Sequence, residues 1–328
     1  MRAFETEVVD AVWAAVEPLI PARTRDRHPL GCHRPRVPDR LCFQGILIRL
    51  VTGCAWVDVE QLLGNQVSDT TLRDRRDEWI AAGVFERLVD EALAGYDRVI
   101  GLDFSECSVD GSQHKAPAGG EGTGPSPVDR GKRGWKWSLF TDRHGIPIGW
   151  TIAGANRNDC ILLEATLDAV ADRGLLLDCE TLHLDRGYDS GVTRRLVTRV
   201  GIEDLVCSRR RKTGTADGKK IVPLGLRWPI ERTNSWLSNF GQLRRNTDRF
   251  VIHRLAQLAL AIVLPSPPSS STGATDGPHD HTYPLELLAS SAVALAAPFW
   301  PVERLVYRSS RTLQPMPRPR RAEQIAVD

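Results

Sequence analysis

The feature that most constrains the fold is a change in residue pattern near position 100. Before it, apolar residues recur at helical spacing in Phe4–Leu19, Leu41–Val51, Val57–Leu63 and Thr70–Ala82. After it, short apolar segments bounded by glycines alternate with amphipathic ones, in the order βββαβαβα ending in a helix from about Arg227. We therefore expect an α/β fold, with a mixed sheet flanked by helices, preceded by an all-helical region.

The expected strands begin with Arg98–Asp110. A hairpin is predicted over Lys136–Thr141 and Ile146–Ala153, and a helix over Cys160–Arg173 that Asp159 would cap. Two further strands and a helix between them complete the pattern: Thr181–Asp185, Val192–Val200 and Glu203–Cys207.

The 328 residues divide into three expected parts. Residues 1–96 would form the helical domain and residues 97–264 the sheet domain. Residues 265–328 hold 10 of the 21 prolines and a Ser-rich opening, so this tail is expected to be disordered. The chain lacks an apolar run long enough for a membrane span, and its acidic start does not resemble a secretory signal, so a cytosolic protein is expected. The seven scattered cysteines exclude a disulfide framework and a zinc site of ordinary spacing.

Part of the helical region has the pattern of a helix-turn-helix motif. A short helix is followed by a turn at Gly64 and by a basic helix that Ser68 would cap. The second helix would enter the major groove of DNA and expose Arg73, Arg75 and Arg76. A plain helical bundle explains the same periodicity, so both alternatives remain open.

Charge is distributed unevenly along the chain. The formal net charge is only +2, but residues 186–254 hold 16 Lys and Arg against 6 Asp and Glu. This excess indicates a region that binds a polyanion, with a solvated basic face as the alternative.

Three carboxylates stand where the expected sheet would bring them together. Asp110 and Asp185 are each predicted to end a strand, and Glu231 lies one helical turn after Arg227. If the two strands are neighbours and the helix crosses their ends, the three acids share one pocket. The alternative for each is ordinary: strand-end aspartates often cap turns, and helical glutamates are commonly solvated. Asp189 is a second candidate in place of Asp185, or a helix cap.

Carboxylates that converge in this way need cations, because their charges repel one another. Ligand sets made of oxygen alone favour Mg²⁺ or Mn²⁺ over zinc. A pair of such ions about 3.5–4 Å apart activates an attacking water and stabilises the leaving oxygen of a phosphodiester. Together with the basic segment, this chemistry indicates DNA as the substrate.

Four segments resemble the DDE transposases of bacterial insertion sequences, of the insertion-sequence-five type. They are Val109–Ser112, Asn156–Asp159, Leu184–Asp189 and Arg227–Thr233. The resemblance extends from about Trp13 to Leu264, and Gly53–Trp56 and the helices after it are similar to the DNA-binding portion of the family.

The resemblance implies a ribonuclease-H-like catalytic core with Asp110, Asp185 and Glu231 as its catalytic and metal-binding triad. Arg227 would then contact a phosphate of the transposon end. Many relatives carry a basic residue shortly after the glutamate, where this chain has Ser238 and Asn239. Further DNA contacts are expected from Arg232, Arg244 and Arg245.

A protein of this family would bind the terminal inverted repeats of its element with a Mg²⁺ or Mn²⁺ pair. It would cleave there by hydrolysis and join the 3′-hydroxyl to target DNA. The expected partners are double-stranded DNA and a second copy of the chain, and the protein would be nucleoid-associated. Two alternatives remain: a ribonuclease-H-like nuclease without strand transfer, and an inactive remnant or regulator that only binds DNA.

Four tryptophans and two histidines each have two possible roles. The tryptophans would stack on unpaired bases or belong to the core; they are Trp135, Trp137, Trp228 and Trp236. His114 and His183 border the expected site, where they would contact a phosphate or serve as ordinary polar residues.

Overall fold

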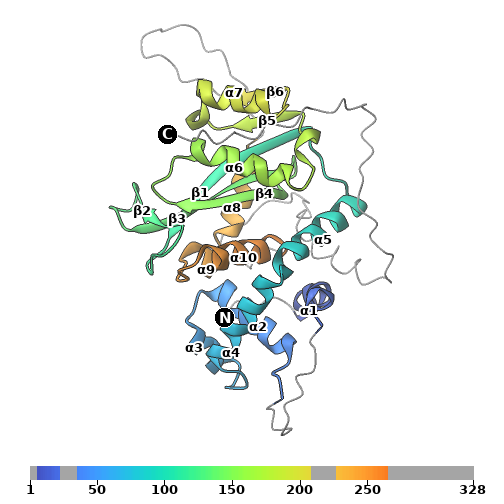
Figure 1. Ribbon diagram of the computed structural model, residues 1–328, viewed down its shortest axis with the longest axis vertical. Coiled ribbons are helices and arrows are strands. Elements are labelled where there is room, and N and C mark those ends of the chain that lie inside the picture. The colour runs from blue at the N-terminus through green and yellow to red at the C-terminus, as the bar shows by residue number, and fades with distance from the viewer. Residues whose placement is uncertain (1–5, 23–34, 208–226, 265–328) are drawn as a thin grey trace, which may run out of the picture. The chain divides into compact units, whose positions relative to one another are not determined.

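The computed structural model describes residues 6–22, 35–207 and 227–264 (Figure 1). The predicted tail, 265–328, and part of the basic segment, 208–226, lie outside the described residues. Within the described ranges, no helix combines the length and apolarity that crossing a lipid bilayer requires.

The amino-terminal part is helical, as the periodicity predicts. Ser68 accepts a hydrogen bond from the backbone N–H of Thr71 and so begins one helix, as expected. Gly53 ends another with a φ of 72°, and a Cβ there would lie 2.8 Å from the Gly241 carbonyl carbon, so only glycine fits. The helices are α1 (Thr6–Val16), the 3₁₀ turn η1 (Glu17–Leu19), α2 (Asp39–Thr52), α3 (Trp56–Leu62), α4 (Asp69–Ala81) and α5 (Val84–Val99).

In the described part of the chain the sheet has six strands. β2 and β4 both pair with β3, and β1, β5 and β6 follow in that order. The β1–β3 and β3–β4 pairs are antiparallel, whereas β5 and β6 run parallel to β1. This order, with three antiparallel strands and then two parallel ones, is the ribonuclease-H-like topology, and the expected fold class is confirmed. The strands are β1 (Glu106–Lys115), β2 (Gly124–Pro125), β3 (Arg133–Thr141), β4 (Pro147–Gly154), β5 (Thr181–Leu184) and β6 (Asp204–Cys207).

Helices cover both faces of the sheet (Figure 1). α6 (Asp159–Ala171) packs on β3 and β4, and α8 (Trp228–Leu237) packs on β1 and β3. Neighbouring residues of β1 identify the two faces, because Asp110 contacts α8 while Gly111 lies against α6. The remaining connections contain the 3₁₀ turns η2 (Leu176–Asp178) and η3 (Arg186–Tyr188) and the helix α7 (Gly191–Arg199).

The last described helices return to the amino-terminal part of the chain. α9 (Gly241–Arg244) packs against α2, and α10 (Val251–Ile262) packs against α4 and α5. Apolar side chains from the helices and from the sheet belong to one continuous core. The boundary expected after residue 96 stays a prediction.

The first strand is placed differently from the expectation. The segment Arg98–Asp110 was expected to be a strand, but α5 continues to Val99 and β1 begins only at Glu106. β1 then runs on to Lys115, so Asp110 lies in the middle of the strand and not at its end. The residues after Gly111, Ser112–Lys115, are polar, yet all four pair with β3.

Candidate active site

Three acidic side chains from three separate elements contact one guanidinium group. Arg227, at the start of α8, lies with Nη1 3.1 Å from Asp185 Oδ1. Its Nη2 lies 3.4 Å from Glu231 Oε1 and 3.9 Å from Asp110 Oδ2. The convergence expected for Asp110, Asp185 and Glu231 is therefore present in the fold, with Arg227 between them.

Asp110 is the most enclosed of the three acids. Its side chain is 21% exposed, against 48% for Asp185 and 57% for Glu231. Burial raises the pKa of Asp110, the Arg227 guanidinium opposes this, and the Asp185 carboxylate adds to the rise. A positive charge at this position therefore favours the ionised form of Asp110.

Asn234 connects Asp110 to the core. Its Nδ2 donates to Asp110 Oδ2 at 3.3 Å, and its Oδ1 accepts from Trp137 Nε1 at 2.8 Å. Both Trp137 and Asn234 are buried, so the tryptophan fixes the amide and the amide orients the carboxylate. Sequence reasoning did not find Asn234. Its position three residues after Glu231, on the next helical turn, is the signal that points to it.

Asp185 follows β5 directly, as expected, and its Oδ1 accepts from the backbone N–H of Arg186 at 2.6 Å. The alternative candidate, Asp189, forms an ion pair with Arg194 at 2.6 Å. Asp185 contacts the shared guanidinium and Asp189 is engaged with α7, so the geometry favours Asp185 as the second member of the cluster.

A fourth carboxylate, Asp159, lies near the cluster. It was expected to cap the helix, but Asn158 holds the cap position and accepts from Cys160 N–H. Asp159 is thereby free to receive Lys136 Nζ at 2.7 Å, and its charge contributes to the raised pKa of Asp110. Its Oδ1 lies 2.6 Å from where a Cβ of Gly111 would be.

The chemistry of the three acids suits divalent metal ions. Their donor atoms are all carboxylate oxygens, and Asp185 and Glu231 are open to solvent. Within the described ranges, no three acidic, histidine or cysteine side chains lie close enough together to form a finished metal site. The guanidinium occupies the position between the carboxylates and supplies the positive charge that they require. We conclude that the residues fit such ions in donor type and charge.

The basic helix α4 differs from its expected exposure. Arg75 and Arg76 were expected to face DNA, and this is wrong, since they are only 4% and 5% exposed. Arg75 bonds to Asp39 and Glu78, and Arg76 to Asp248, because their helix face packs inward. Arg73 is on the outer face and pairs with Asp69. The buried pairing agrees better with the helical-bundle alternative for this face of α4.

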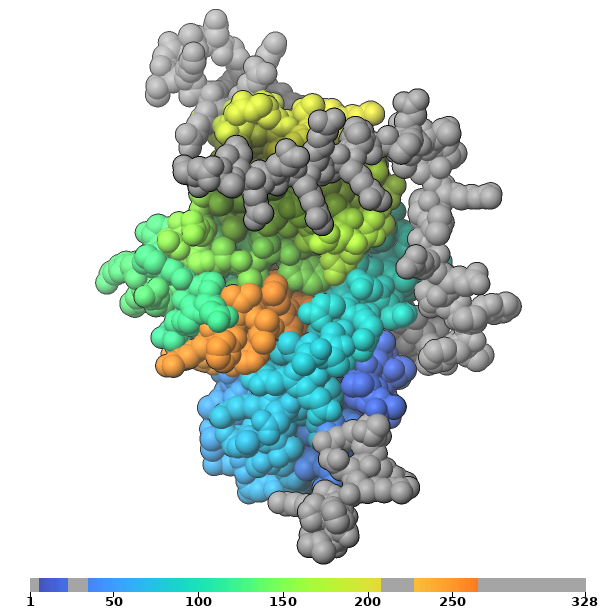
Figure 2. All heavy atoms as spheres, viewed as in Figure 1, coloured from blue at the N-terminus to red at the C-terminus, as the bar shows by residue number. Residues whose placement is uncertain are grey.

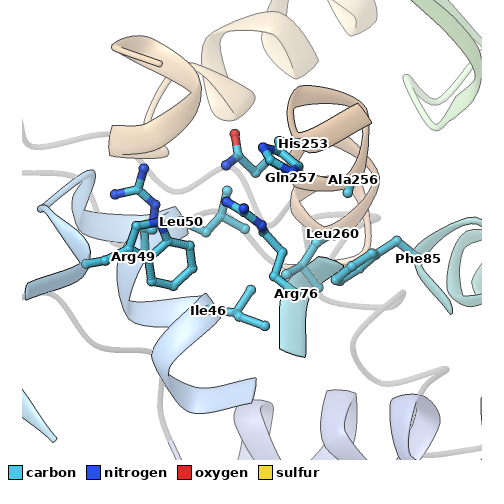
Figure 3. Close-up of a pocket in the computed structure, with 10 residues that line it drawn as sticks. Ile46, Arg49, Leu50, Arg76, Phe85, His253, Ala256, Gln257 and Leu260 are labelled. Carbon is cyan, nitrogen blue, oxygen red and sulfur yellow. The ribbon is translucent and has the colours of Figure 1, made fainter. Parts of the chain in front are cut away.

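Arg76 belongs to a pocket away from the acidic cluster. Figure 3 shows Arg49 and Arg76 facing His253 and Gln257 of α10. Both guanidinium groups contact Asp248, at 3.4 Å and 3.2 Å, and both lie over the Trp56 ring. This pocket is a structural junction between α2, α4 and α10 and contains none of the expected catalytic residues.

The structure shows which of the four tryptophans belong to the core and which groups the two histidines contact. Three of the tryptophans, Trp135, Trp137 and Trp236, belong to the core. Trp228 is 58% exposed, with the Arg232 guanidinium 4.8 Å from its ring centroid. His114 is half-buried and stacks on Trp137 with 3.9 Å between ring centroids, while buried His183 pairs with Glu106.

The remaining arginines expected to contact DNA are accessible. Arg244 and Arg245 are exposed at the end of α9. Arg232 is partly exposed and donates to the His144 carbonyl at 2.7 Å. Ser238, at the position where many relatives carry a basic residue, instead donates to the Asn234 carbonyl on its own helix.

Comparison with known families agrees with this architecture. The transposase DDE domain family matches residues 101–264, which is half of the chain, and the chain belongs to this family. More particularly, residues 8–89 match a family described as transposases of the IS4/5 family. The expected family is thus confirmed.

Individual relatives share part of the chain. It is 39% identical over 132 residues to a protein of Burkholderia cepacia described as a transposase for insertion sequence element IS402. That match covers 39% of this chain and 60% of the relative, less than two thirds of its length. A 16.2 kDa protein of the same element is 36% identical over 118 residues, covering 36% of this chain and 79% of that protein.

Solved structures give weaker likenesses. A pre-cleavage Mos1 transpososome matches with a TM-score of 0.29 and 10% identity, covering 85% of this chain and 84% of the Mos1 chain. A Mos1 paired-end complex with the left transposon end has a TM-score of 0.24 and 10% identity, with coverages of 73% and 80%. The strand order, and not these likenesses, defines the fold.

Proposed function

We propose that this chain is a transposase that binds the terminal inverted repeats of its insertion sequence and moves the element by DNA cleavage and strand transfer. The observation that supports this most directly is the contact of Asp110, Asp185 and Glu231 with one cation within a DDE-family domain. Three carboxylates repel one another, so their convergence beside an exposed surface is favoured by cations bound there.

Asp110, Asp185 and Glu231 would hold Mg²⁺ or Mn²⁺, in a pair of ions. When bound, such ions activate the attacking water and stabilise the leaving oxygen. Asn234 would keep the Asp110 carboxylate oriented, through its bond to Trp137.

Arg227 would bind the phosphate that is cleaved. A guanidinium group donates two parallel hydrogen bonds to phosphate oxygens, and Arg227 is held at the site where the three carboxylates meet. In the first step, water attacks phosphorus and the P–O bond to the 3′ oxygen of the element breaks. This cleavage leaves a 3′-hydroxyl on the element. In the second step, that hydroxyl attacks a phosphodiester of target DNA, forming one P–O bond and releasing another.

The partners proposed are double-stranded DNA, as transposon end and as target, and a second copy of the chain, because two ends must be joined. We propose residues 1–96 as the DNA-binding domain and residues 97–264 as the catalytic domain. Arg73, Arg232, Arg244 and Arg245 would contact the phosphate backbone, which makes binding weaker as salt concentration rises.

The test is an assay of joined product. Purified protein is incubated with Mg²⁺, target plasmid and labelled duplexes that carry the inverted repeats flanking the gene. Joined product supports the transposase, whereas nicks alone support the nuclease alternative. If DNA is bound but neither cleaved nor joined in Mg²⁺ or Mn²⁺, the chain is a DNA-binding remnant or regulator.

A further inference from the structure

A second cluster of charge lies beyond the end of β1, away from the acidic site. We call it the basic surface. Its members are exposed Lys and Arg side chains from three segments of the chain: Lys115, Lys132, Arg133, Arg244, Arg245 and Arg249.

Backbone contacts hold these segments together. Lys115 forms a parallel β-bridge with Arg245, and the Lys115 carbonyl accepts from Asn246 N–H at 2.9 Å. The Arg133 carbonyl accepts from Ala116 N–H at 2.9 Å, which joins the start of β3 to the end of β1. Figure 2 shows the green β2–β3 region directly beside the orange segment that contains α9. The backbones of the three segments that contain the basic residues are therefore held next to one another by the fold.

The positive charges of the basic surface are not neutralised by ion pairs to acidic side chains of the described residues. Within the described ranges, none of its six side chains forms an ion pair, whereas every basic residue of α2 and α4 does. The acidic neighbours are Glu121, whose carboxylate accepts from Val251 N–H, and Asp129. Cations that repel one another and are not neutralised within the chain favour binding of a polyanion.

We propose that the basic surface binds the phosphate backbone of duplex DNA, on the same duplex whose scissile phosphate reaches Asp110. Lys115 is five residues after Asp110 on one extended strand, a rise of about 17 Å. A DNA strand advances 3.4 Å per nucleotide, so this rise corresponds to about five nucleotides. The basic surface would hold the duplex about half a helical turn from the acidic site. The position of the duplex relative to Asp110 rests on the proposed function, whereas the binding of DNA to the basic surface does not.

Duplex DNA fits this surface better than an acidic protein does. Protein–protein interfaces are depleted of charged residues at their centres, particularly Lys, whereas protein–DNA interfaces are strongly positive. Lys115 and Arg245, which the β-bridge joins directly, are both exposed and both positively charged.

The test measures affinity and its salt dependence for a labelled 30-base-pair duplex of arbitrary sequence. Arg245→Gln, Arg249→Gln and Lys115→Gln are compared with Arg98→Gln. Arg98 is an exposed arginine at the end of α5 that has no ion pair within the described residues. Each lost phosphate contact should reduce the slope of log K against log salt by about 0.9. The double variant Arg245→Gln/Arg249→Gln should therefore lower the slope by about two, and Arg98→Gln should leave it unchanged. Thermal melts confirm that every variant is folded.

The outcomes separate this inference from the proposed function. Slopes equal to that of Arg98→Gln in both single variants, and in Lys115→Gln, overturn the basic surface even if the wild type cleaves DNA. Reduced slopes support it even if no cleavage occurs, in which case only the transposase proposal fails. A stronger effect of the same variants on binding of polyglutamate than on the duplex identifies an acidic protein as the occupant and overturns the proposal.

Discussion

Arg227 Nη2 lies 3.9 Å from Asp110 Oδ2, and this pair connects the start of α8 to the middle of β1. The two residues are far apart in the chain, and their ion pair connects α8 to β1. Because Arg227 also contacts Asp185 and Glu231, one side chain offsets the repulsion within the whole cluster.

Replacement of Arg227 should therefore destabilise the protein when divalent ions are removed by a chelator. We expect Arg227→Gln to lower the free energy of unfolding by about 1–3 kcal/mol, because three carboxylates lose charge-assisted bonds. The measurement is urea denaturation. Arg186→Gln, which removes an equal charge from an exposed position of the same site, should change it by less than about 0.5 kcal/mol. Equal effects of the two substitutions would show that Arg227 is not the counterion of the cluster.

Asp110→Asn should abolish DNA cleavage while DNA binding is retained. The amide keeps the shape and the contact with Asn234 but cannot serve as an anionic ligand. We expect a loss of about 10²–10³-fold in cleavage rate, the order seen when a group that stabilises the transition state electrostatically is removed. Binding of labelled duplex should change less than twofold. The exposed helical acid Asp168 provides the control, since Asp168→Asn should cleave at the wild-type rate.

Gly111 and Asp159 should show strong energetic coupling. A Cβ at position 111 would lie 2.6 Å from Asp159 Oδ1 and 3.3 Å from the Trp137 carbonyl oxygen. Gly111→Ala should cost about 1–3 kcal/mol, as other overpacking changes do. In the Asp159→Ala background the same substitution should cost clearly less, giving a double-mutant coupling above about 0.5 kcal/mol. Additive effects in denaturant unfolding would place the Asp159 carboxylate elsewhere.

Stability should fall on the acid side because of His114. Burial lowers the pKa of His114 to about 3, so this ring stays neutral in the folded protein down to about that pH. In the unfolded chain the same ring takes up a proton once the pH falls below the ordinary histidine pKa of about 6.5. Stability from this group is fully present above about pH 6.5 and falls by about 1.4 kcal/mol per pH unit below it, until about pH 3. Between pH 7.5 and 5.5, His114→Phe should therefore lose about 1.4 kcal/mol less than the wild type does. Parallel losses in the two proteins would contradict this assignment.

Asp248 should be among the most sensitive positions of the chain. Burial raises its pKa, but Arg49 and Arg76 more than offset this and hold the pKa below its usual range. Asp248→Asn leaves the buried Arg49 guanidinium without its carboxylate partner and Arg76 with only the half-exposed Asp77, and should cost about 3–5 kcal/mol. The readout is a thermal or urea melt, and Asp77→Asn, a half-exposed partner of Arg76, provides the comparison. A cost of less than 1 kcal/mol would indicate that water or Trp56 compensates for the lost charge.

Local signals in the sequence determined most of the element order. Ser68 and Gly53 set helix ends by hydrogen bonding and by backbone conformation that depend on a few neighbouring residues, so those ends were predictable. The second and third acids of the site were placed for a similar reason, because Asp185 directly follows an apolar strand and Glu231 shares a helix face with Arg227.

Only the tertiary structure decided which arginines are exposed, where β1 lies and which residues support Asp110. Arg73 and Arg76 are near neighbours in sequence, but one meets solvent and the other meets Asp248, from 172 positions further along the chain. The polar second half of β1 is a strand only because β3 supplies its hydrogen bonds. Asn234 likewise reaches Asp110 because α8 packs across the sheet. Helical periodicity and caps are short-range properties that sequence carries directly, whereas burial and partner choice depend on segments that meet only in the folded chain.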